Sequence, residues 1–197
     1  RAAEDFHFLD KLAKIGKIGL VGTTTVFPSP RPSRRVPFGT GRRMHRFLQN
    51  GGRDEYLVYH PVIFSILREW LAVMDADPDE DPDLLLNLAR KIHPELRNYL
   101  DLCRFSDRWM QVRRNCPDPL HLRHQFHVWF DGLKTLRLVH HLSRSSYPPM
   151  SMFEGLKLLL SQMGQILPSI TDFHSGIPEP EMQFRILEEL RSRFPES

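Results

Sequence analysis

The sequence predicts an all-α fold, a multi-helix bundle with a long irregular basic segment near its N-terminus. Apolar residues recur at helical spacing along most of the chain, and short runs rich in proline and glycine separate these periodic segments. Of the 197 residues, 41% are hydrophobic and 26% are charged, which is typical of a globular protein. A chain of this length suits one domain, so we expect a single helical domain over residues 1–197.

The periodic segments predict six or seven helices. They are expected over residues 2–15, 61–74, 83–92, 94–115, 119–143, 150–167 and 179–194. Most of the connections between them are short, and short connections favour antiparallel neighbours. The order of helices therefore predicts a bundle.

The first helix, over residues 2–15, has Phe6, Leu9 and Ala13 on one face. Residues 18–27 follow it and combine β-branched side chains with glycine. This composition predicts either a short strand or an extended loop, so at most one short strand is expected in the chain.

The long connection over residues 16–59 contains the basic arm, which we define as residues 28–46. Four prolines and two glycines in residues 28–43 are expected to prevent regular structure there, and residues 43–49 are expected to form one or two helical turns. A connection of this length in a compact domain is usually functional or disordered.

The helix over residues 61–74 is expected to lie at the centre of the bundle. Pro61 occupies the favoured first helical position, and the residues from Val62 to Met74 leave little polar face. A helix that is apolar on nearly all sides is normally enclosed by others.

The longest expected helix, over residues 119–143, carries a seam of apolar side chains. Steps of four and three residues separate Leu122, Phe126, Trp129, Leu133 and Leu136. His140 falls at the same angle as this seam, five helical turns after Leu122, and is therefore expected to face inward.

The net charge of +3 is unevenly distributed: residues 1–53 carry +8, residues 54–117 carry −4 and residues 118–197 carry −1. The basic arm holds six arginines, Arg31, Arg34, Arg35, Arg42, Arg43 and Arg46. Guanidinium groups bind carboxylates and phosphates through paired hydrogen bonds. The first hypothesis is therefore a non-enzymatic interaction module that binds an acidic protein surface or a nucleic acid through this arm. Alternatively, the arm lies on the protein's own acidic surface, such as residues 75–83.

The second hypothesis is a haem- or metal-dependent enzyme with a histidine site inside the bundle. On one straight helix, His124, His127 and Asp131 fall within a narrow arc opposite the seam, and pairs of them can supply two ligands to a transition metal. His140, facing inward, is the candidate ligand to a haem iron or a metal. The first hypothesis implies no cofactor.

Several functional classes find no support in the sequence. The chain has no window of about 18 apolar residues, so no membrane partner is expected. Residues 75–83 resemble a calcium loop but have Glu80 where glycine is required, and the Walker A pattern is absent. Cys103 and Cys116 are expected on one helical stretch, about 20 Å apart, hence as free thiols. Free thiols favour an intracellular, reducing compartment such as the cytoplasm.

Overall fold

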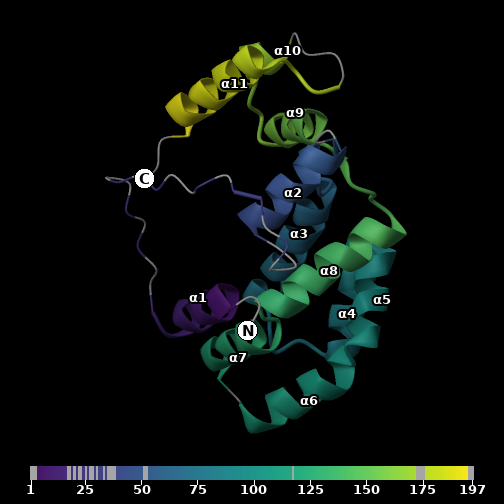
Figure 1. Cartoon of the computed structure of the whole chain (residues 1–197). Helices are drawn as coiled ribbons and strands as arrows, with labels where there is room; N and C mark the ends of the chain where they lie inside the picture. The colour runs from purple at the N-terminus through teal and green to yellow at the C-terminus, as the bar shows by residue number, and fades with distance from the viewer. Residues whose placement is uncertain are drawn as a thin grey trace. The chain divides into compact units, whose positions relative to one another are not determined.

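The computed structural model describes residues 4–16, 39–50, 53–116, 118–171 and 176–194, with single positions between 19 and 34. Most of these residues are helical (Figure 1). The chain divides into two compact units, which are described separately: a central unit, Tyr59–Pro149, and a terminal unit, Arg1–Val58 with Met150–Ser197. The single domain over 1–197 stays a prediction.

The central unit consists of six helices: α3 (Val62–Ala76), α4 (Pro82–Ile92), α5 (Pro94–Leu102), α6 (Phe105–Asn115), α7 (Pro119–Trp129) and α8 (Gly132–Ser145). The terminal unit has five α-helices, α1 (Glu4–Ile15), α2 (Thr40–Asn50), α9 (Met152–Gln162), α10 (Pro168–Thr171) and α11 (Pro180–Arg193). It also has a 3-10 turn, η1 (Arg53–Tyr56), and two strands, β1 (Leu57–Val58) and β2 (Met150–Ser151).

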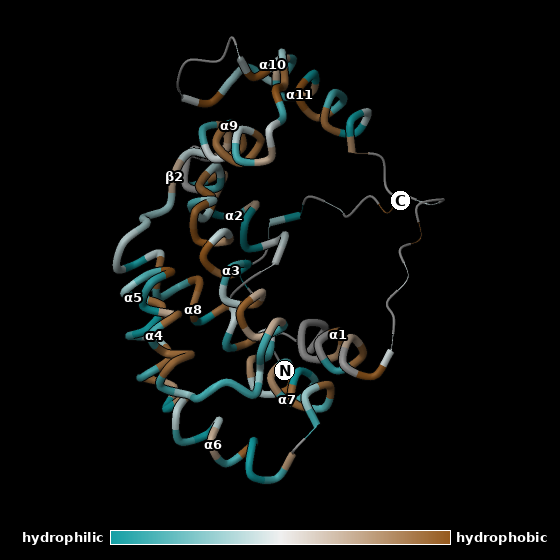
Figure 2. The backbone as a smooth tube through the Cα atoms, turned by 180° about the vertical axis from the view of Figure 1, so that it is seen from behind, coloured by the Kyte–Doolittle hydropathy of each residue, from teal (hydrophilic) through white to brown (hydrophobic). Residues whose placement is uncertain are grey.

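Helix α3 supplies the middle of the central unit's core. Its buried side chains are Ile63, Ile66, Trp70 and Met74, spaced three, four and four residues apart. Figure 2 shows how hydrophobic this helix is. The opposite side is not enclosed, however, because Phe64 is exposed. The helix thus buries one face rather than its whole circumference, which differs from the sequence prediction.

Aromatic rings surround Trp70. Phe105 and Phe126 each meet its ring edge-on, with centroids 5.6 and 6.0 Å away, and Trp109 stacks on Phe105. The indole N–H of Trp109 donates to the carbonyl oxygen of Pro78 at 2.9 Å. The buried indole N–H of Trp70 has no hydrogen-bond partner among the described residues. The two tryptophans are thus equally buried but differ in one hydrogen bond.

The helix expected over residues 94–115 is in fact two helices, because one straight helix could not bury all of its large apolar side chains on a single face. At about 100° per residue, Phe105 and Trp109 would lie on the opposite side of a straight helix from Leu96 and Leu100. All four are buried. The chain resolves this conflict at Arg104, which takes a left-handed conformation with φ of 53° and separates α5 from α6.

The helix expected over residues 119–143 is broken for the same reason. The buried residues of α8 are Leu138, Val139 and Leu142, which lie opposite the predicted seam. Asp131 ends the straight run and caps α8 by accepting a hydrogen bond from the backbone N–H of Lys134 at 2.9 Å. As a result Leu122 and Phe126 are buried as predicted, whereas Leu133 and Leu136 are exposed.

The two breaks, together with the additional helices α2 and α10, correct the expected number of helices. The described residues form eleven α-helices rather than six or seven, and two short strands rather than at most one. Helix α2 begins at Thr40, inside the range expected to be irregular. The segment expected to be helical over 150–167 ends at Gln162, where Gly164 adopts a positive φ of 66° and the N–H of Gln165 bonds back to Leu160. The strand or loop expected over residues 18–27 falls largely outside the described residues.

The terminal unit has a smaller core, which consists of Phe153, Leu160, Leu167, Ile170 and Ile186. Strands β1 and β2 pair antiparallel, with Val58 opposite Met150. Helix α9 packs closely on β1: a Cβ atom at Gly155 would lie 2.8 Å from the side chain of Val58. The hydroxyl of Tyr56 donates to Gln183 of α11 at 3.3 Å, which links η1 to the C-terminal helix.

The two tryptophans provide a matched test of the central core. We expect Trp109→Phe to lower the free energy of unfolding by about 1 kcal/mol more than Trp70→Phe, because only Trp109 loses a hydrogen bond and leaves a buried carbonyl oxygen unpaired. Urea unfolding of both variants measures this difference. Equal losses for the two variants would contradict the assignment of the Trp109–Pro78 hydrogen bond.

The carboxylate of Glu189 is expected to make the terminal unit sensitive to acid. Two residues hold the pKa of Glu189 below its ordinary value of 4.5. Ser169 faces the carboxylate with its hydroxyl and donates its backbone N–H to it at 3.1 Å, and the guanidinium group of Arg193 lies 3.2 Å away. A carboxylate whose pKa is lower in the folded state than in the unfolded state stabilises the fold at pH values above the unfolded-state pKa. This contribution is lost as the pH falls through the folded-state pKa. Glu189→Gln should therefore lower the urea midpoint at pH 7 but not at about pH 2. The same loss at both pH values would rule out this linkage.

Candidate functional site

Helix α2 carries three of the six arginines of the basic arm, Arg42, Arg43 and Arg46. It starts immediately after Gly39, whose positive φ of 96° turns the chain into the helix. At about 100° per residue, Arg42 and Arg46 lie within about 40° of each other, and Arg43 lies about 60° further round. The helical turns expected over residues 43–49 thus begin earlier, at Thr40, and half of the arm's arginines project from this helix.

Two of these arginines share one carboxylate. Glu55 of η1 lies 3.3 Å from Nε of Arg43 and 2.8 Å from Nη2 of Arg46. Its side chain is only 14% exposed, whereas those of Arg43 and Arg46 are 70% and 48% exposed. Two positive charges thus face one negative charge, and the outer sides of both guanidinium groups remain open to solvent. Within the terminal unit, Glu55 is thus an acidic partner of the arm; that the arm lies on the acidic residues 75–83 stays a prediction.

Arg34 makes a contact of a different kind. Its Nε donates to Nε2 of His45 on α2 at 2.9 Å. The side chains of Arg31 and Arg34 are exposed. Arg35 lies outside the described residues. The structure therefore brings Arg34 together with His45 of α2, and Arg43 together with Arg46.

The acidic loop over residues 75–83 is held by cations of the central unit instead. Nε of Arg113 lies 2.9 Å from the carboxylate of Asp79, and Arg123 donates to the carbonyl oxygen of Asp75 at 2.6 Å. Asp81 accepts a hydrogen bond from the backbone N–H of Asp83 at 2.9 Å and thereby caps α4. This loop therefore joins α3 to α4 and is anchored to α6 and α7.

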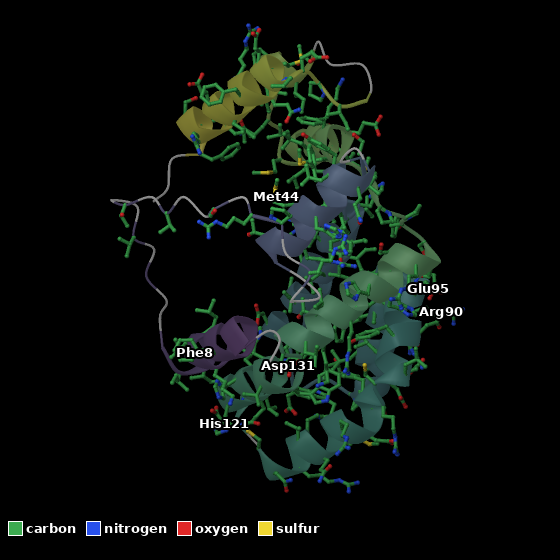
Figure 3. The ribbon with its side chains drawn as sticks, viewed as in Figure 1. Phe8, Met44, Arg90, Glu95, His121 and Asp131 are labelled. Atoms are coloured by element: carbon green, nitrogen blue, oxygen red, sulfur yellow. The ribbon has the colours of Figure 1, made fainter. Side chains whose placement is uncertain are left out.

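The predicted arc of His124, His127 and Asp131 is wrong, because Asp131 belongs to the cap of α8 and not to α7 (Figure 3). His127 lies 3.5 Å from the carboxylate of Asp75. The ring of His124 meets that of His121 at a centroid distance of 6.3 Å. No group of three or more histidine, cysteine or acidic side chains among the described residues has the spacing of a metal site.

His140 is half-buried rather than enclosed by the core. Its Nε2 shares a hydrogen bond with the hydroxyl of Tyr59 at 2.7 Å, and the two rings are tilted against each other. The inward orientation expected for His140 assumed a straight helix from Leu122, and the break at Asp131 removes that assumption. A haem or metal role for His140 stays a prediction.

Two other histidines have structural roles that the sequence reasoning missed. His60 and His93 each precede a proline at a helix start: Pro61 is the N-cap of α3, and Pro94 is the first residue of α5. Each histidine accepts a hydrogen bond at Nδ1 from the backbone N–H two residues later, at 3.3 and 3.1 Å. Both rings lie against Tyr147, with centroids 5.3 and 5.4 Å away. The repeated His-Pro dipeptide is the sequence signal for this arrangement, since proline is favoured at a helix start, and His93 before Pro94 is the N-cap of α5.

A neighbouring cluster joins α5 to α8. Nε2 of His141 lies 2.8 Å from the carboxylate of Glu95, and the ring of His141 also contacts Tyr99. Burial, and then the nearby thiol of Cys103, raise the pKa of Tyr99, so its phenol stays protonated and donates to the carbonyl oxygen of Lys134 at 2.7 Å. The cluster therefore ties helices together. Cys103 and Cys116 are both free thiols, as expected.

Comparison with known proteins adds no functional information: no family model, no curated protein and no solved structure matches the chain. No helix among the described residues combines the length and the apolar character needed to cross a membrane. The candidate site is therefore defined by geometry and charge alone, and it is the arginine-bearing surface of α2 with η1.

The cap formed by His93 can be tested separately from any function. We expect His93→Ala to lower the free energy of unfolding by about 1 kcal/mol, because the N–H of Glu95 loses its acceptor at the start of α5. His93→Asn keeps an acceptor at this position and should retain most of that stability. Thermal unfolding of the two variants makes the comparison, and equal destabilisation by both would show that ring packing on Tyr147, rather than the cap, is the main contribution.

Proposed function

We propose that this chain is a non-enzymatic interaction module that binds an anionic partner, an acidic protein surface or a nucleic acid, through the basic arm, residues 28–46. The observation that carries the proposal is the excess of positive charge. Residues 11–53 contain ten lysines and arginines and no aspartate or glutamate. The carboxylate of Glu55 faces two of these arginines and can neutralise only one.

The arrangement of α2 supports binding of an anion from outside the chain. Arg43 and Arg46 are oriented by the carboxylate of Glu55, so part of the entropy cost of fixing their long side chains is met before a partner arrives. The exposed guanidinium edges keep donors free, and guanidinium groups form paired hydrogen bonds to phosphates and carboxylates. Electrostatic attraction of this kind also speeds association.

Charge reversal tests the proposal. The triple variant Arg31→Glu, Arg34→Glu, Arg42→Glu leaves the ion pairs of Glu55 intact and should weaken binding to a DNA duplex and to polyglutamate. For the duplex, the slope of log affinity against log salt should become shallower by about 0.9 for each arginine that contacts a phosphate. Fluorescence anisotropy over a salt series gives both quantities.

The matched control reverses three exposed arginines of the central unit, Arg90, Arg108 and Arg114, and should leave both affinities nearly unchanged. Equal effects of both triple variants, or no binding of any polyanion by the unaltered chain, would overturn the proposal.

A further inference from the structure

Four of the ten histidines gather where the starts of α3 and α5 meet the end of α8 in the central unit. His60 precedes α3, His93 is the N-cap of α5, and His140 and His141 lie near the end of α8. Tyr147 follows α8, and its ring centroid lies 5.3 Å from that of His60 and 5.4 Å from that of His93. One tyrosine thus joins the starts of two helices to the end of a third.

This junction includes both ends of the central unit. The chain enters the unit at Tyr59, one residue before His60, and leaves it at Pro149, two residues after Tyr147. Strand β1 directly precedes the unit along the chain, and strand β2 directly follows it. The ring contact between His60 and Tyr147 therefore holds the two ends of the central unit side by side.

Both helix starts require a neutral imidazole. Nδ1 of His60 accepts a hydrogen bond from the backbone N–H of Val62 at 3.3 Å, and Nδ1 of His93 accepts one from that of Glu95 at 3.1 Å. A ring nitrogen accepts only when it carries no proton, and an imidazolium ion carries a proton on both nitrogens. Protonation would also place a positive charge at the positive end of a helix dipole. Both hydrogen bonds are therefore lost when these rings are protonated.

The ion pair between α5 and α8 responds to acid in the opposite direction. Oε2 of Glu95, which is labelled in Figure 3, lies 2.8 Å from Nε2 of His141. The other carboxylate oxygen of Glu95 accepts a hydrogen bond from Asn98 at 2.9 Å, and the ring of His141 also contacts Tyr99. Protonation of His141 gives this pair two full charges and so strengthens it. The contact between α5 and α8 is thus kept as the pH falls.

Tyr59 and His140 are the other titratable pair at this junction. The hydroxyl of Tyr59 lies 2.7 Å from Nε2 of His140, and it can donate to a neutral imidazole or accept from a protonated one. This hydrogen bond therefore survives in both states. Among the described residues, no carboxylate lies within 4 Å of a ring nitrogen of His60 or His93. No direct ion pair thus offsets the charge that protonation brings to these two rings.

We propose that the contacts of Tyr147 with the starts of α3 and α5 form a pH-sensitive clamp, which is closed while His60 and His93 are neutral and released when both are protonated. Histidine is the side chain that normally changes its charge between about pH 5 and 8. The stabilisation by the clamp is present while the rings are neutral and is lost as the pH falls. The pair of Glu95 and His141 confines the release to the two helix starts and residues 146–149. The clamp does not involve the basic arm and is independent of the proposed function.

Amide hydrogen exchange of the full chain, followed by NMR at about pH 7.5 and about pH 5.5 and corrected for the intrinsic effect of pH, tests the clamp. We expect the protection of the amides of Val62, Glu95 and Tyr147 to fall about fivefold or more at the lower pH, as for one lost hydrogen bond. The amide of Leu85, which donates to Asp81 in α4, should keep its protection. Global unfolding is a poorer measure, because the effect of His141 on stability has the opposite sign.

The double variant His60→Asn with His93→Asn removes the titration and keeps an acceptor at both positions. An asparagine side chain accepts from the backbone N–H two residues later and takes up no proton in this pH range. The three amides should therefore have the same protection at both pH values in this variant. The matched control, His121→Asn with His124→Asn, changes two exposed histidines of α7 and should leave the response to acid unchanged.

A second measurement does not depend on any variant. In the unaltered chain, the ring signals of His60 and His93 should shift with pH over the same range in which the amide of Tyr147 loses its protection. Separate transitions would overturn the inference, and so would equal protection of the three amides at both pH values. It is also overturned if the asparagine variant still loses protection in acid as the unaltered chain does, or if the α7 control abolishes the response.

Discussion

Burial of the aromatic rings around Trp70 is the constraint on which the central unit depends. Phe105 and Trp109 come from α6 and Phe126 from α7, and none of them reaches Trp70 unless the chain turns between helices. Burying a large aromatic side chain contributes up to about 3 kcal/mol, which exceeds the 1–2 kcal/mol cost of placing one residue such as Arg104 in the left-handed region. The core therefore decides where the helices end.

The terminal unit depends less on the burial of apolar side chains. Its core contains five buried apolar residues, all of them after β2, and the helices before η1 add none among the residues described. What holds α2 in place is electrostatic: Glu55 faces Arg43 and Arg46. Exposed ion pairs contribute little, about 0–1 kcal/mol each. These ion pairs therefore contribute only a small part of the free energy that orders α2.

The helical class and many of the buried positions could be predicted from spacing alone, since Ile63, Trp70, Leu122 and Phe126 are buried where periodicity places them. The helix breaks could not, because periodicity within one segment does not show that the next segment buries the opposite face. The signals were local: Asp131 before Gly132 is a cap followed by a turn-forming residue, and each His-Pro pair marks a helix start. The metal arc failed because it assumed one straight helix through Asp131.

For the charged residues of the candidate site, prediction from the sequence meets a similar limit. The sequence indicates that residues 28–46 are basic, but it does not say which arginines face the protein and which face outward. That depends on one carboxylate: Glu55, eight residues beyond Phe47, faces two arginines and so determines that the charged side of α2 lies toward η1. If the arginines had no such partner, α2 could turn its polar side to any anion and keep its apolar side against its own chain. With that partner, Arg43 and Arg46 hold the charged side of α2 toward η1, and Phe47 and Leu48 remain exposed.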